Sequence, residues 1–219
     1  MSGGATNLLV RTPLVNDSVA DNGETFRLTV TPTGGVAASG TATIKDDGTG
    51  DIFNNNGTTD PTAIKNDDRP VTVSSPTVNE ASPYTVFTVG LTSGQTVSLS
   101  LSNGTATGGS TSPTDGSVDF SNSGLQYSLD NGTTWTNYST AFAATLTGGA
   151  TNLLVRTPLV NDSVADNGET FGLTVTPTGG VAASGTATIK DDGTGDIFYN
   201  NGTTDPTAIK NDDRLVTVS

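Results

Sequence analysis

Short segments in which apolar and polar residues alternate recur along this chain. Every second residue is apolar between positions 25 and 31, and again between positions 95 and 102. The apolar members of these two segments are Phe26, Leu28, Val30, Val97, Leu99 and Leu101. Alternation with a period of two places one set of side chains on a buried face and the other set in solvent. Both segments are therefore predicted to be half-buried β-strands.

Similar patterns and the turn residues between them divide the rest of the chain into short elements. Further strands are expected at residues 5–15, 40–45, 71–78, 84–91, 118–120, 125–129, 150–160, 169–176 and 184–190. Pro13 places the first of these at an edge or a bulge, because proline cannot donate to a ladder. Asn131-Gly132 predicts a hairpin turn, with Trp135 and Tyr138 on the returning strand. Short strands at this spacing, with no amphipathic helix among them, predict an all-β, antiparallel β-sandwich.

The chain contains a long internal repeat. Residues 148–219 copy residues 3–74 with three differences, Arg27 against Gly172, Asn54 against Tyr199 and Pro70 against Leu215. Self-similarity of this kind indicates a tandem array. The segment at 75–147 occurs once, so we expect one complete domain at 75–195 and the second half of another at 1–52. Polar stretches at 53–74 and 196–219 are expected to be connectors to the following repeats.

The half-domain at 1–52 presents a problem, because its apolar face cannot remain exposed to water. Three solutions are open at this point. The face docks on the complete domain, or a neighbouring molecule completes it by strand complementation, or the chain is an excerpt from a continuous fibre.

The amino-acid composition excludes several classes of catalysis, metal site and partner. The chain has no histidine and no cysteine, which excludes imidazole and thiol catalysis, disulfides and thiolate or imidazole metal sites. A net charge of -13 argues against nucleic acid and anionic membranes and favours cations. No apolar run is long enough to span a bilayer. A pair of carboxylates could serve glycoside hydrolysis, but no cluster of aromatic residues indicates a sugar cleft, and we expect no enzyme activity.

Two loops of the complete domain carry most of its carboxylates. The first contains Asn161, Asp162, Asp166 and Glu169, and the second contains Asp191 and Asp192. The loops follow strands separated by an even count, so we expect them at the same end of the sandwich. Clustered carboxylates suit a hard cation with six to eight oxygen ligands. The alternative is that these are ordinary solvated turns, because Asp and Asn are common turn formers.

The acidic half resembles the Calx-beta domain of the sodium-calcium exchanger and of long bacterial adhesins. The resemblance lies in Val160-Asn161-Asp162-Ser163-Val164-Ala165-Asp166-Asn167-Gly168-Glu169-Thr170-Phe171 and in Ala187-Thr188-Ile189-Lys190-Asp191-Asp192, with weaker matches at Val78-Asn79-Glu80 and Val118-Asp119-Phe120. It covers residues 76–192 and recurs over 3–47. It implies an immunoglobulin-like sandwich that binds Ca²⁺.

Carried over by position, the resemblance implies a set of calcium ligands. In the complete domain they are Glu80, Asp119, Asp162, Asp166, Glu169, Asp191 and Asp192; in the first copy they are Asp17, Asp21, Glu24, Asp46 and Asp47. The chain departs from the family pattern at Asn161, Asp166 and Gly193, which implies fewer ions or weaker binding. The first copy lacks counterparts of Glu80 and Asp119, so its site is expected to be incomplete.

Together these features predict a calcium-stabilised extender repeat of a giant, secreted bacterial surface adhesin or fibre. Its expected partners are neighbouring repeats or further copies of itself. The alternative is a module that binds a carbohydrate or a protein through calcium, for which Tyr199 is the one candidate aromatic. A calcium sensor is a third class, but no segment indicates a two-state element.

Overall fold

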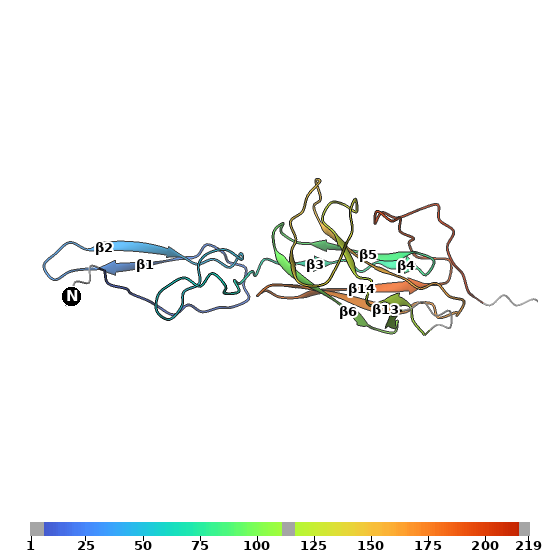
Figure 1. Ribbon diagram of the computed structural model, residues 1–219, viewed down its shortest axis with the longest axis horizontal. Coiled ribbons are helices and arrows are strands. Elements are labelled where there is room, and N and C mark those ends of the chain that lie inside the picture. Colours follow the sequence, from blue (N-terminus) through green and yellow to red (C-terminus); the bar gives the residue numbers. More distant parts are fainter. Residues whose placement is uncertain (1–6, 111–116, 215–219) are drawn as a thin grey trace, which may run out of the picture. The chain divides into compact units, whose positions relative to one another are not determined.

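The computed structural model describes residues 7–110 and 117–214 and contains two compact units (Figure 1). Unit 1 extends to Arg69 and includes residues 178–180, and unit 2 comprises the remainder. All regular elements in the described residues are strands, so the predicted all-β fold with antiparallel sheets is confirmed. No helix in this part of the chain has the length and apolar character needed to cross a membrane.

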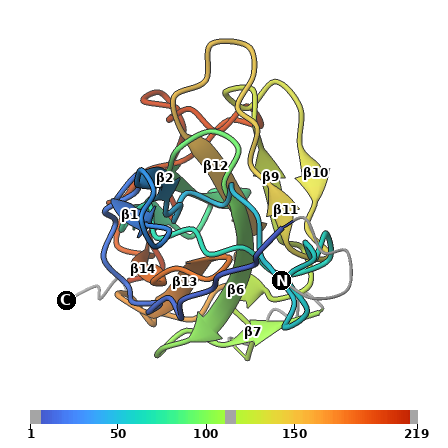
Figure 2. The same cartoon turned by 90° about the vertical axis from the view of Figure 1, so that its left-hand side faces the viewer.

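Unit 2 contains two five-stranded sheets (Figure 2). The first has the order β10 (Thr136–Asn137), β9 (Gln126–Ser128), β12 (Leu153–Pro158), β5 (Tyr84–Gly90) and β3 (Thr72–Val73), with every neighbouring pair antiparallel. The second has the order β11 (Phe142–Ala143), β6 (Thr96–Asn103), β13 (Thr170–Pro177), β14 (Ala183–Lys190) and β4 (Thr77–Asn79). Here β4 runs parallel to β14, and the other pairs are antiparallel. Two short strands, β7 (Gly108–Gly109) and β8 (Phe120–Ser121), form a separate parallel pair.

The core of unit 2 lies between its two sheets. The alternation in β13 buries Phe171, Leu173 and Val175, none of them more than 1% exposed. The Phe171 ring stacks on Phe120 with 4.1 Å between the ring centroids and meets Phe87 edge-on at 5.9 Å. Both sheets therefore share one aromatic and aliphatic core, as the alternating pattern predicts.

Unit 1 contains the same alternating sequence without the strands that bury it. Its only strands in the described residues are β1 (Thr25–Val30) and β2 (Ala38–Thr43), an antiparallel pair. Phe26, Leu28 and Val30 are 39, 44 and 47% exposed, whereas their counterparts in β13 are buried. The prediction of a strand at 5–15 is wrong for residues 7–15, which have no strand pairing, while the copy of this segment forms β12 between β5 and β9. Residues 5 and 6 lie outside the described part.

The turn at Asn131-Gly132 has the expected backbone, with φ angles of 56° and 79°. The loop it belongs to, residues 129–135, is longer than a two-residue hairpin, and Trp135 and Tyr138 flank β10 rather than lying on it. The Trp135 ring lies 4.0 Å from the guanidinium of Arg156, whose other face covers Tyr84 at 3.9 Å. Trp135 therefore packs against Arg156.

Residues 53–69 and 196–214 of the stretches expected to be connectors are parts of the units that precede them, whereas residues 70–74 belong to unit 2 and contribute β3. In unit 2, Ile197 is buried and Phe198 packs against the core. Arg156 donates from Nη1 to the carbonyl of Asn200 at 2.6 Å. In unit 1, residues 48–69 belong to the same compact unit as β1 and β2. Each connector is therefore folded onto its own unit, and its last residues in that unit contact the acidic residues that follow β2 or β14.

Candidate metal centre

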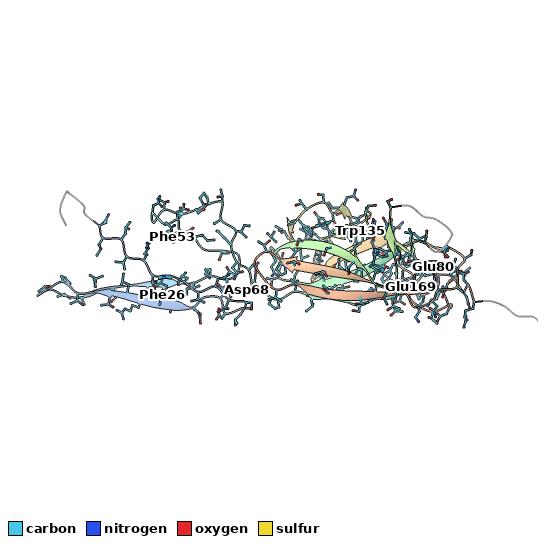
Figure 3. The ribbon with its side chains drawn as sticks, turned by 90° about the horizontal axis from the view of Figure 1, so that it is seen from below. Phe26, Phe53, Asp68, Glu80, Trp135 and Glu169 are labelled. Carbon is cyan, nitrogen blue, oxygen red and sulfur yellow. The ribbon has the colours of Figure 1, made fainter. Side chains whose placement is uncertain are left out.

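Strand directions bring the carboxylates of unit 2 together. β4 and β14 are parallel, so Glu80 and Asp191, which follow them, emerge at the same end of the sheet. β13 is antiparallel to β14 and begins at that end, which places Asp166 and Glu169 of the preceding loop there too. Figure 3 shows Glu80 and Glu169 at this end of unit 2. We call this group of side chains the acidic tip.

Three carboxylates converge at the acidic tip. One oxygen from each of Asp119, Asp166 and Glu169 lies within 4.8 Å of the other two. Calcium bonds to oxygen at 2.3–2.6 Å, so ligands on opposite sides of one ion stand about 5 Å apart. The three side chains are therefore close enough to bind the same ion.

The core fixes two members of this trio. Phe120 follows Asp119 directly and Phe171 lies two residues beyond Glu169, and their stacked rings hold the two segments together. Asp119 is anchored further, because the backbone N–H of Thr107 donates to its Oδ2 at 2.6 Å. The positions of Asp119 and Glu169 are thus set by the packing of the core.

The carboxylates repel one another strongly. Burial, followed by the charges of Asp119 and Asp166, raises the pKa of Glu169 to about 7. Burial and the charges of Asp119, Asp162 and Asp191 also raise the pKa of Asp166. A nearby cation would reverse this effect by favouring the ionised forms. The electrostatics of the trio therefore suit a divalent ion.

Glu80 forms a second part of the acidic tip. Burial, with a contribution from the charge of Asp162, raises its pKa to about 7. Its Oε1 accepts the backbone N–H of Asp162 at 2.9 Å, and its Oε2 accepts the side-chain amide of Asn211 at 3.2 Å. Asp162 Oδ1 accepts the N–H of Val164 at 2.7 Å, a hydrogen bond within its own loop. The charge of Asp162 contributes to the raised pKa values of Glu80 and Asp166.

Asp191 has a buried carboxylate oxygen without a hydrogen-bond partner among the described residues. It is 1% exposed, and its Oδ2 accepts the backbone N–H of Asp166 at 3.0 Å. Its Oδ1 is buried and accepts no hydrogen bond from any described residue. A buried carboxylate oxygen without a partner is costly. An oxygen-binding cation would satisfy it, so the residues present fit the Ca²⁺ that the resemblance implies.

Asp192 does not join the acidic tip. Its carboxylate accepts hydrogen bonds from the hydroxyl of Thr194, from the backbone N–H of Thr194 at 3.1 Å and from the side-chain amide of Asn167 at 2.9 Å. The hydroxyl of Thr194 is the largest cause of its lowered pKa. The structure thus gives Asp192 the role of a turn former rather than a ligand of the trio.

The first copy repeats these local bonds without the converging trio. Asp17 accepts from Val19, Asp46 accepts the N–H of Asp21 at 2.8 Å, and Asp47 accepts from Asn22 and Thr49. Among the described residues, Asp17, Asp21, Glu24, Asp46 and Asp47 belong to no group of three carboxylates close enough to share an ion. The reason is that the segment at 75–147 supplies two carboxylates in unit 2 and has no counterpart in unit 1.

Our sequence analysis missed the residues that the connector and β4 contribute. Asn211 donates to Asn161 at 2.8 Å and to Asp213 at 2.7 Å, and its backbone N–H donates to Asn79 Oδ1 at 2.8 Å. Asp213 bonds through its backbone to the carbonyl of Asp191 at 2.9 Å. The available signal was the echo of residues 43–47 in 63–68, which indicates a short hairpin and recurs at 188–192 and 208–213.

Comparison with known proteins adds no assignment. No protein-family model matches the chain, and no curated protein matches it.

Proposed function

We propose that this chain is a calcium-stabilised structural extender repeat of a giant secreted or cell-surface bacterial adhesin or fibre. One observation carries the proposal: one oxygen from each of Asp119, Asp166 and Glu169 lies within 4.8 Å of the other two, and Asp166 is bonded through its backbone N–H to Asp191, whose second carboxylate oxygen is buried and unpartnered. This arrangement resists folding while it lacks a cation and favours folding once a cation is bound. The stability of the domain is then linked to the concentration of calcium outside the cell.

Near-identity between the two copies supports a structural role. Selection for length alone tolerates repeated copies of one unit, whereas a ligand-binding surface needs particular residues in one place. The high negative charge of the chain also suits a medium that contains calcium.

Neighbouring repeats, or self-association, provide the partner for unit 1. The apolar residues of β1 are exposed, whereas their counterparts in β13 are buried against the facing sheet, where Phe171 meets Phe87 of β5. A segment equivalent to residues 76–147, from a preceding repeat or another molecule, would therefore bury this face. Adding that segment before residue 1 should make residues 7–15 exchange their amide hydrogens slowly. Unchanged exchange would contradict this role.

The test of the proposal is thermal unfolding and small-angle scattering in millimolar Ca²⁺ and in excess chelator. We expect removal of calcium to lower the Tm by more than about 10 °C, since ligand at 1,000 times its Kd contributes about 4 kcal/mol. We also expect a longer and more flexible particle. Identical melting curves and superimposable scattering profiles would refute the proposal.

The alternative, a calcium-dependent carbohydrate- or protein-binding module, has weaker support. Tyr84 and Trp135 are occupied by Arg156, whereas Tyr199, 46% exposed, is a candidate platform in unit 2. A glycan array probed with and without calcium distinguishes this function from the structural one.

A further inference from the structure

Residues 66–68 in the connector of unit 1 form a short antiparallel contact with residues 46–48, which we call the end of the acidic segment. Asp47 pairs with Asp67, and the backbone N–H of Asp68 donates to the carbonyl of Asp46 at 2.9 Å. This register places Asp46 directly opposite Asp68 on one face of the pair, with Asn66 diagonal to Asp46 on the same face. Side chains directly opposite one another have Cβ atoms about 4.5–5.5 Å apart.

Three oxygen atoms on this face lack hydrogen-bond donors. Asp46 Oδ2 accepts the N–H of Asp21 at 2.8 Å, and Asp68 Oδ2 accepts the amide of Asn66 at 2.6 Å. The second carboxylate oxygens, Asp46 Oδ1 and Asp68 Oδ1, and the amide oxygen of Asn66 are buried and have no partner among the described residues. Asp46 and Asp68 are only 9 and 8% exposed. Each bare oxygen is an acceptor, so the missing partner is a cation or a donor.

Neighbouring basic residues are engaged by other carboxylates. Arg69 donates to both oxygens of Asp67 at 2.8 and 2.6 Å, and Lys45 lies 3.9 Å from Asp47. In an extended pair these four residues point away from the face that carries Asp46 and Asp68, because side chains alternate between faces. The charge of Asp46 contributes to the raised pKa of Arg69, but no described residue donates a hydrogen bond to Asp46 Oδ1 or to Asp68 Oδ1. Two opposed, buried carboxylates with bare oxygens form a costly arrangement.

We propose that Asp46, Asn66 and Asp68 form a calcium site that needs no residue from the segment at 75–147. Two carboxylates and one amide oxygen, completed by water, match the hard oxygen ligands that calcium accepts. The site closes the connector of unit 1 onto the end of the acidic segment, so ion binding orders residues 48–69. It deepens the proposed function and rests on its calcium chemistry, but not on the trio in unit 2.

The copy in unit 2 shows the same pairing. Asp192 pairs with Asp212, Asp213 donates through its backbone to the carbonyl of Asp191, and Asp191 Oδ1 is also buried without a partner. There the pair adjoins the acidic tip through Asn211, which donates to Glu80. Unit 1 is therefore the place where the connector site can be tested separately.

The test uses the full chain, Ca²⁺ as the only added ligand, and Asp68→Asn and Asp46→Asn as variants. Asp51→Asn is the charge-matched control, since Asp51 is exposed and lies within residues 48–69, which the site is proposed to order. Calorimetric titration should show one bound ion fewer per chain in either variant, with no loss in the control. Trp135 fluorescence reports whether unit 2 remains folded in every protein.

Hydrogen exchange provides the second readout. Peptides that contain Asn54 differ in mass from those that contain Tyr199, so the two connectors can be followed separately. Calcium should slow exchange at residues 46–69 at least tenfold in the wild type and the control, but not in the variants. Equal stoichiometry and equal protection in Asp68→Asn would overturn the inference and show that water satisfies these oxygens.

The outcomes separate this inference from the proposed function. Protection in unit 2 alone would leave the extender role standing and remove the connector site. Protection at residues 46–69, with no calcium effect on the loops that carry Asp166 and Glu169, would support the connector site and remove the basis of the proposed function.

Discussion

Replacing Glu169 by glutamine should stabilise the calcium-free chain and weaken its response to calcium. Burial and the neighbouring carboxylates raise the pKa of Glu169 from 4.5 to about 7 in the folded state. A raised folded-state pKa means that ionisation is penalised by folding. The penalty is nearly absent below about pH 4.5 and is fully present above about pH 7.

The size of the effect follows from this pKa. A shift of about 2.5 units corresponds to about 3 kcal/mol at alkaline pH, and partial exposure of the side chain reduces it to about 1–2 kcal/mol. Glu169→Gln should therefore raise the Tm of the calcium-free chain at pH 8 by about 3–6 °C. At pH 4.5 the variant and the wild type should melt within about 1 °C of each other, because the wild-type carboxyl is then protonated in the folded state.

In the presence of calcium, the wild type should become more stable than Glu169→Gln. The variant retains two of the three converging carboxylates, so its affinity should fall at least tenfold and its gain in Tm on adding calcium should be smaller than that of the wild type. The assay is differential scanning calorimetry at pH 8 and pH 4.5, with chelator or with millimolar Ca²⁺. Asp196→Asn, which removes the same charge at an exposed position, is the control. A calcium-free variant that is less stable than the wild type at pH 8 would show that the reasoning is mistaken.

Three further changes test the packing around the site. Phe171→Ala should destabilise unit 2 by about 3–5 kcal/mol, whereas Phe26→Ala at the equivalent position of the first copy should cost less than about 1 kcal/mol because its ring is 39% exposed; equal losses in urea unfolding would contradict the difference in burial. Arg156→Lys should lower the stability of unit 2 by about 1–3 kcal/mol, because lysine cannot stack between two rings and donate in two directions, and an unchanged midpoint in urea would argue against that role. Gly132→Ala should release the connector of unit 2, since a Cβ there would lie 1.7 Å from the carbonyl oxygen of Asn201; faster proteolysis after residue 195 is the expected result, and an unchanged cleavage pattern would count against it.

Local signals in the sequence predict the strands of unit 2 well. The alternation at 95–102 corresponds to β6 and that at 169–176 to β13, because period-two patterns directly reflect a sheet with one buried face. The acidic residues of the two loops are likewise apparent, and the even number of strands between them correctly places the loops at one end of the sheet.

The amino-acid sequence establishes the internal repeat, the all-β class and the positions of the carboxylate residues. The sequence also indicates that the second copy belongs to the complete domain, but the strand partners are seen only in the tertiary structure, where identical residues form β12 in unit 2 and remain unpaired at 7–15. The tertiary structure also decides which carboxylates meet: Asp119 joins the trio and Asp192 does not. The physical reason is that a strand pattern specifies a buried face but not its partner. Some partners come from segments more than 60 residues away, as in the pairing of β13 with β6.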